Sequence, residues 1–168
     1  MVCCATGHRP KGFPFQREAD EMGYQEYLDR LYREVKKIIL EGSNHFITGM
    51  AEGADIDFAD FVIHFRDDEE FDITLEAALP YPISQQKMIE TYSDDRYAVF
   101  TQCDRKTIVS PHYFKGCMQK RNCYMVDQSD VILAIWNGKK QGGTWNTIRY
   151  ARSKGKTIRY IMLNEILK

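Results

Sequence analysis

Three segments of the chain combine glycines with hydroxyl or charged side chains directly after an apolar run. They are Thr6-Gly7-His8-Arg9-Pro10, Gly49-Met50-Ala51-Glu52-Gly53-Ala54-Asp55 and Gly138-Lys139-Lys140-Gln141-Gly142-Gly143-Thr144. Glycine lets the backbone approach a ligand closely, and the free amide groups at the start of a helix attract anions. The three segments are therefore candidates for binding a phosphate-bearing molecule.

The first segment offers three different groups to such a ligand. Thr6 carries a hydroxyl, Gly7 leaves room for contact with the backbone, and Arg9 carries a forked cation that matches phosphate or carboxylate. The same residues would also suit a plain turn with an arginine at the surface. Because the polar groups cluster where a strand is expected to end, we favour the ligand site.

The second segment places Gly49 and Gly53 four residues apart, between a predicted strand and a predicted helix. This spacing allows a tight loop whose amide groups cradle a phosphate at the start of the helix. Asp55 falls in the first helical turn, where a carboxylate suits the helix dipole. It is equally suited to accept a hydrogen bond from a ribose hydroxyl, and the sequence leaves both roles open.

The third segment brings Gly142, Gly143 and Thr144 to the start of another predicted helix. Bare amides and a hydroxyl at a helix N-terminus form an anion site, although a threonine that only caps its helix is the alternative. Arg121 and Asn122 lie on the preceding helix. There the arginine can reach a phosphate and the asparagine a base or ribose, unless both belong to a solvated helical face.

The elements that position these residues follow from hydrophobic periodicity. The pattern predicts strands at 2–6, 45–48, 71–79, 106–109, 131–136 and 157–162, and helices at 24–41, 54–66, 84–90, 93–102, 117–128 and 144–154. Strands that alternate with helices of this length indicate βαβ units. We therefore predict an α/β protein with a Rossmann-like three-layer sandwich, in which helices cover both faces of a mostly parallel sheet. Residues 1–168 form a single domain in this prediction.

The composition is that of a globular protein without membrane spans or metal sites. Hydrophobic residues make up 43% and charged residues 28% of the chain, as in an ordinary globular protein. No apolar run reaches the roughly 18 residues of a membrane span, and the first residues do not form a signal peptide, so we expect a cytoplasmic protein without a membrane partner. The five cysteines and four histidines show no metal-ligand spacing. No metal ion and no cofactor is predicted.

Charge is distributed unevenly along the chain. Residues 1–100 have a net charge of −10 and residues 101–168 a net charge of +9. The basic half faces an anion, associates with the acidic half of another copy in a homo-oligomer, or is simply solvated. The isoelectric point of about 6.4, and the lack of a basic helix interleaved with aromatic residues, argue against a nucleic-acid partner.

Five stretches together resemble a known family. They are TGHRP (6–10), GMAEGAD (49–55), ALPYPISQQ (78–86), RNCYMVDQSDVILAIW (121–136) and GGTWNTIRYA (142–151), and they resemble the YpsA-like group of the SLOG superfamily. That superfamily includes the lonely-guy phosphoribohydrolases and the DNA-processing protein A. The resemblance implies a Rossmann-like fold and a nucleotide or nucleotide-derived ligand. It assigns Gly49, Gly53 and Asp55 to a first phosphate loop, and the residues 142–144 to a second.

One departure from the family bears on catalysis. Lonely-guy enzymes follow the second glycine loop with a catalytic glutamate, whereas this chain has Trp145-Asn146-Thr147 there. Only Asp55, Glu52 or His8 remains as a general acid or base. We therefore favour a nucleotide-binding sensor or regulatory module. The alternatives are a nucleotide-processing enzyme, namely an N-glycosidase or phosphoribohydrolase, and a DNA-binding protein.

The base of a nucleotide would need an aromatic surface or a set of polar groups to recognise it. Four aromatic residues are candidates for stacking, although such residues more often pack in the core or at a rim. They are Phe13, Tyr81, Trp136 and Trp145.

Overall fold

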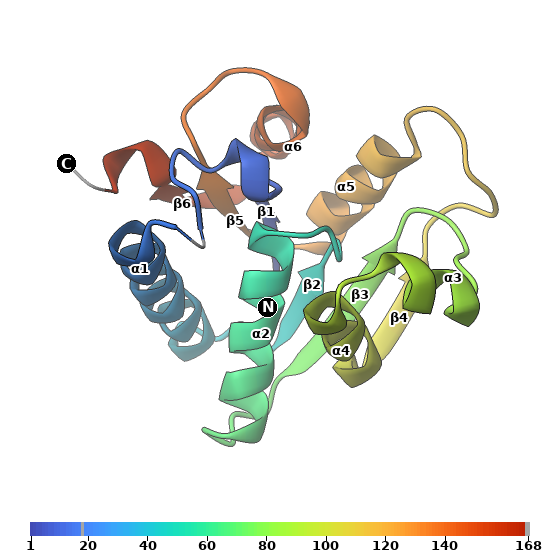
Figure 1. Ribbon diagram of the computed structural model, residues 1–168, viewed down its shortest axis with the longest axis horizontal. Helices are drawn as coiled ribbons and strands as arrows, with labels where there is room; N and C mark the ends of the chain where they lie inside the picture. Colours follow the sequence, from blue (N-terminus) through green and yellow to red (C-terminus); the bar gives the residue numbers. More distant parts are fainter. Residues whose placement is uncertain (18, 167–168) are drawn as a thin grey trace.

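The computed structural model describes residues 1–17 and 19–166 and contains a sheet of six parallel strands (Figure 1). The strands are β1 Val2–Gly7, β2 His45–Thr48, β3 Thr74–Leu79, β4 Arg105–Ile108, β5 Val131–Trp136 and β6 Thr157–Met162. Their order across the sheet is β4-β3-β2-β1-β5-β6. The central strands β1 and β5 consist mainly of buried residues, as expected when both faces of a sheet are covered.

Six α-helices connect the strands. They are α1 Glu21–Leu40, α2 Ala54–Asp67, α3 Gln85–Thr91, α4 Asp94–Gln102, α5 Cys117–Gln128 and α6 Gly142–Ser153, with 3₁₀ turns at Pro10–Gly12 and Leu163–Glu165. Figure 1 shows α1, α2 and α4 on one side of the sheet and α5 and α6 on the other. The predicted Rossmann-like three-layer sandwich is confirmed, and the sheet is parallel throughout. None of the helices in the described ranges has the length and apolarity of a membrane span.

Two hydrophobic layers hold the helices to the sheet. The larger layer packs α1, α2 and α4 against one face, with Tyr27, Leu31, Phe58 and Phe65 fully buried. The smaller layer lies under α5 and α6 on the other face. Burial of apolar side chains in both layers provides the main stabilisation of such a sandwich.

Among the elements that start elsewhere than the sequence predicts, α1 and β3 are shifted the most. Helix α1 begins ahead of the predicted Tyr24, because the Asp20 side chain accepts a hydrogen bond from the Gly23 amide at 3.0 Å and caps an earlier turn. Strand β3 begins after the predicted Phe71, whose amide still donates to the Phe65 carbonyl at 3.0 Å in the turn after α2. Neither shift moves a candidate site residue.

The strand order creates a crevice at the carboxyl ends of β1 and β5. From β1 the chain moves outward through β2 and β3 to β4, and then returns to place β5 on the other side of β1. Gly7 pairs with Ile135, so the two strands end at the same level. Ligands of open α/β sheets bind at such a reversal of strand order. The loops after β1 and β5 therefore leave the sheet side by side at the position where a site is expected.

A buried carboxylate fixes α5, which carries Arg121, against the sheet. Glu76 of β3 is 1% exposed and accepts hydrogen bonds from the Tyr124 and Thr107 hydroxyls and from His45 Nε2, each at 2.7 Å. Burial raises the pKa of Glu76, but the hydrogen bonds from these three side chains outweigh burial and lower it to about 2. Because Tyr124 lies one helical turn after Arg121, its bond to Glu76 holds that part of α5 in place.

This network predicts a dependence of stability on pH. Between the ordinary carboxyl pKa of 4.5 and the folded value of about 2, the unfolded chain binds the proton and the folded chain does not. Stability should therefore fall as the pH drops through this range, with Glu76 contributing up to about 1.4 kcal/mol per pH unit. Urea unfolding from pH 5 to pH 2 should show a shallower dependence for Glu76→Gln. Equal slopes for both proteins would contradict the assignment.

Candidate functional site

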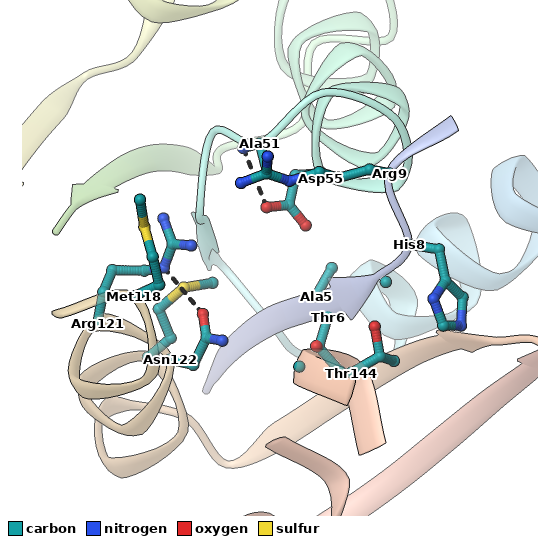
Figure 2. Close-up of a pocket in the computed structure, with 13 residues that line it drawn as sticks. Ala5, Thr6, His8, Arg9, Ala51, Asp55, Met118, Arg121, Asn122 and Thr144 are labelled. Carbon is teal, nitrogen blue, oxygen red and sulfur yellow. Dashed lines mark hydrogen bonds between the residues drawn. The ribbon is translucent and has the colours of Figure 1, made fainter. Parts of the chain in front are cut away.

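A cavity of about 260 Å³ opens at the carboxyl ends of β1 and β5 (Figure 2). Residues from β1, α2, α5 and α6 surround it, although these elements lie far apart in the sequence. All the predicted site residues line it except Gly49, Gly53 and Gly142. The lining residues are Ala5, Thr6, Gly7, His8, Arg9, Ala51, Asp55, Met118, Arg121, Asn122, Met125, Gly143 and Thr144.

The first turn of α6 forms one wall of this cavity. The helix begins at Gly142 and not at Thr144, and its N-cap residue Gln141 provides no side-chain hydrogen bond. Thr144 is therefore not the cap, which removes the alternative role considered for it. The first amides of a helix have no intrahelical acceptor, so the Gly143 and Thr144 amides are available to an anion. The Thr144 side chain is buried beside them.

In the loop between β2 and α2, three of the amides predicted to cradle a phosphate have acceptors within the protein. Its Ala51 amide donates to Asp55 Oδ2 at 3.1 Å, and the Ala54 amide donates to the His8 carbonyl at 3.1 Å. The Met50 amide donates to the Thr48 hydroxyl at 3.2 Å. Since these three amides already have protein acceptors, the loop presents Ala51 and the Asp55 carboxylate to the cavity.

Gly49 and Gly53 shape the loop without lining the cavity. A Cβ atom on Gly53 would lie 2.5 Å from the His8 carbonyl oxygen, and its φ of +95° favours glycine. A Cβ atom on Gly49 would lie 2.8 Å from Asp55 Oδ2 and 3.1 Å from Arg121 Cζ. Both glycines permit close packing between segments, and Gly49 also lines a smaller adjoining cavity. Their predicted contact with a ligand stays a prediction.

Arg121 is a buried cation in the opposite wall, only 6% exposed. Its Nη1 donates to the Gly49 carbonyl and, at 3.5 Å, to the Ala78 carbonyl, while its Nε donates to Asn122 Oδ1 at 2.8 Å. Nη2 has no hydrogen-bond partner within the described ranges and remains free to donate. Burial lowers the pKa of Arg121 and the nearby Asp55 carboxylate opposes that shift. The guanidinium stays charged, as arginine does in proteins.

Asp55 is the buried carboxylate of the cavity. Burial raises its pKa, and the surrounding guanidinium groups of Arg121, Arg96 and Arg9 oppose this shift. One oxygen, Oδ2, accepts from the Ala51 amide, whereas Oδ1 has no partner in the part of the chain that the structure describes. The two roles that the sequence left open are therefore compatible, because Oδ2 supports the loop and Oδ1 remains available as an acceptor.

Arg9 completes the charged part of the site. Its side chain is exposed, makes no hydrogen bond or ion pair within residues 1–17 and 19–166, and extends across the loop that carries Ala51 and Asp55 (Figure 2). Three guanidinium groups thus surround one carboxylate. This excess of positive charge at a crevice attracts anionic ligands.

The other two candidate acids differ in position. His8 lines the cavity, but its Nε2 accepts a hydrogen bond from the Asn137 amide at 3.1 Å, which identifies the ring as neutral. Burial and the nearby Lys139 lower the pKa of His8. Glu52 does not line the cavity, and its Oε1 accepts from the Ser93 hydroxyl at 2.7 Å. Asp55 is the titratable group that combines burial, a place in the cavity and an unpaired oxygen.

The proposed stacking residues do not enter this cavity. Phe13 is buried against Tyr27 in the core, and Trp136 stacks on Trp145 with centroids 5.4 Å apart.

The sequence analysis missed Met118 and Met125, which line the cavity from α5. Their spacing of three and four residues from Arg121 places all three on one helical face and was an available signal.

The site shows no arrangement for a metal ion. In the described ranges, no three histidine, cysteine or acidic side chains gather as ligands. The ligand chemistry of the cavity is that of backbone amides, hydroxyls, guanidinium groups and one carboxylate.

Comparisons with known proteins concern the chain as a whole. The model of the YspA SLOG family matches residues 3–166. Among solved structures, the chain is similar to the X-ray structure of TM1055, a structural genomics target, with a TM-score of 0.54 and 16% identity over 94% of this chain and 71% of that one. At this identity the likeness shows the fold alone. No curated protein matches the chain.

Substituting Gly49 tests how closely the site is packed. The new methyl group of Gly49→Ala would press on Asp55 Oδ2 at 2.8 Å and on Arg121 Cζ at 3.1 Å. We expect a loss of about 1–3 kcal/mol in the free energy of unfolding, measured with urea. Gly143→Ala is the matched control, because a Cβ there has no neighbour within 4 Å. Similar stabilities for the two variants would contradict the packing described.

Proposed function

Because the chain belongs to the YspA SLOG family, we propose that it binds a nucleotide or a nucleotide-derived phosphate ligand and acts as a sensor or regulatory module. One observation carries the proposal. The free amides at the start of α6 face Arg121 and Arg9 across a single cavity, so neutral donors and cations converge from opposite sides. Such convergence suits the several oxygens of a phosphate group.

The phosphate is expected at the α6 wall. The Gly143 and Thr144 amides donate along the helix axis, where the helix dipole also favours negative charge. The Thr6 hydroxyl lies beside them at the end of β1. Backbone donors on a rigid strand and helix are fixed before the ligand arrives, which reduces the entropy lost on binding.

The sugar is expected between α2 and α5. Asp55 Oδ1 is an unpaired acceptor suited to a ribose hydroxyl. Asn122 uses its oxygen to accept from Arg121, which leaves its amide nitrogen to donate to the ligand. An acceptor and a donor close together can recognise the paired hydroxyls of ribose.

Binding can be tested through ligand-induced stabilisation. We expect nucleotides, ADP-ribose or NAD to raise the melting temperature, because a ligand of the folded state at 100 times its Kd adds about 2.7 kcal/mol. Isothermal titration then gives the affinity. Absence of binding across nucleotides of all four bases would contradict the proposal.

Arg9 provides a substitution that separates binding from folding. The residue is exposed and has no partner in the described part of the chain, so Arg9→Gln should leave the melting temperature unchanged. Loss of its bond to a phosphate should weaken binding about tenfold or more. Arg149→Gln removes the same charge from an exposed position on α6 outside the cavity and should not change the affinity. Equal effects of both variants would indicate only a general charge effect.

A nucleotide N-glycosidase or phosphoribohydrolase is the second candidate, and the state of Asp55 favours it. Burial raises the pKa of this carboxyl group, and it keeps one unpaired oxygen in the cavity. A carboxyl group with a raised pKa in a cleft is suited to general acid–base chemistry.

This second reading has its own experiment. Incubation with nucleoside monophosphates should release free base, detected by chromatography, and Asp55→Asn should abolish release while titration still shows binding. The amide keeps an oxygen that can accept from the Ala51 amide, so the loop should stay folded. Binding by the wild-type protein without release of base would support the sensor and exclude this reaction.

A further inference from the structure

A second, smaller cavity continues from the first. It has a volume of about 50 Å³ and shares Arg9, Ala51, Met118 and Arg121 with the larger one. On its far side are residues that the proposed function does not use, among them Tyr92 and Arg96. The two arginines in the shared wall therefore face a ligand in either cavity.

Tyr92 lines this second cavity and carries an unpaired polar group. Its hydroxyl oxygen is buried and has no hydrogen-bond partner within the described residues. Burial raises the pKa of Tyr92, while the nearby guanidinium groups of Arg96 and Arg121 oppose that shift. A buried hydroxyl without a partner costs free energy, and native proteins rarely retain one without a reason.

Arg96 is held in position beside this hydroxyl. Its Nε donates to the Met50 carbonyl at 2.5 Å, and its guanidinium carbon lies 3.8 Å from the centroid of the Tyr92 ring. The two Nη groups have no partner in the described part of the chain. Together with Arg9 and Arg121, Arg96 supplies oriented donors around a neutral hydroxyl, which is the donor set of an anion site.

The size of the cavity limits what can occupy it. A volume of about 50 Å³ is comparable with one or two water molecules, each of which takes about 30 Å³ in the liquid. It accommodates a compact group of a few atoms but no nucleobase. With three guanidinium groups around it, a phosphate suits the cavity by both size and charge.

We infer that Tyr92 and Arg96 form a second phosphate subsite, so that the ligand is a nucleoside diphosphate or a molecule containing one. This inference rests on the proposed function, because the first phosphate and the sugar occupy the larger cavity. Arg9 and Arg121, which lie between the cavities, would contact both phosphates. The unpaired Tyr92 hydroxyl would then donate to the second phosphate.

Matched pairs of ligands test the inference without knowledge of the base. Titrations compare AMP with ADP, GMP with GDP, CMP with CDP and UMP with UDP. For the base that binds, we expect the diphosphate to bind about tenfold or more tightly than the monophosphate. Tyr92→Phe should reduce this ratio and leave the affinity for the monophosphate unchanged.

The same substitution has a second readout that a purely structural tyrosine would not give. Because Tyr92→Phe removes a buried hydroxyl without a partner, it should raise the melting temperature of the ligand-free protein. Tyr27→Phe is the matched control, since the buried Tyr27 hydroxyl donates to Asp57 Oδ2 at 3.0 Å. That variant should lower the melting temperature and leave the ratio of affinities unchanged.

The outcomes distinguish the two proposals. If no mononucleotide or dinucleotide ligand binds, both the proposed function and this subsite are wrong. If monophosphates bind and the diphosphate has no advantage, or if Tyr92→Phe leaves that advantage intact, the proposed function stands and the subsite is wrong. A lower melting temperature for Tyr92→Phe would also overturn the inference, because it would show that the hydroxyl has a partner in the free protein.

Discussion

The buried guanidinium of Arg121 is the interaction on which the site depends. It joins α5 on one face of the sheet to the loop after β2, through the Gly49 carbonyl, and it faces the Asp55 carboxylate without a direct ion pair. A buried charge is costly unless hydrogen bonds and opposite charge compensate for it. The loop must therefore pass close to α5, and Gly49 is the residue that leaves room for this approach.

The backbone amides of the two glycine segments, 49–55 and 138–144, differ in their hydrogen bonds. The loop at 49–55 uses three of its amides to bond to Thr48, to Asp55 and to the His8 carbonyl after β1, which supports the loop. The start of α6 has no cap from a side chain, and its amides stay available. Unsatisfied amides at a helix terminus, with guanidinium groups nearby, are suited to an anion.

The acidic and basic parts of the chain supply helices to opposite faces of the sheet. Helices α1 and α2, with most of α4, come from the acidic part of the chain and cover one face of the sheet, while α5 and α6 come from the basic part and cover the other (Figure 1). The larger cavity is lined from both parts of the chain, with Asp55 from the acidic part and Arg121 from the basic part. Long-range attraction of anions towards the α5 and α6 side follows from this arrangement.

The sequence by itself determined the strands, the helices, their parallel layering and the residues that gather after β1 and β5. It could do so because hydrophobic periodicity and glycine position are local properties, read within a few residues. The boundaries of α1 and β3 escaped it, since a cap by Asp20 and a turn at Phe71 compete with the apolar pattern. Only the tertiary structure decided that Gly49 and Gly53 lie outside the larger cavity, that Thr144 is not a cap, and that Tyr92 lies beside Arg96 with its hydroxyl unpaired. The packing of the two glycines depends mainly on segments far apart in the sequence, the loop after β1 for Gly53 and α5 for Gly49, which no local pattern contains.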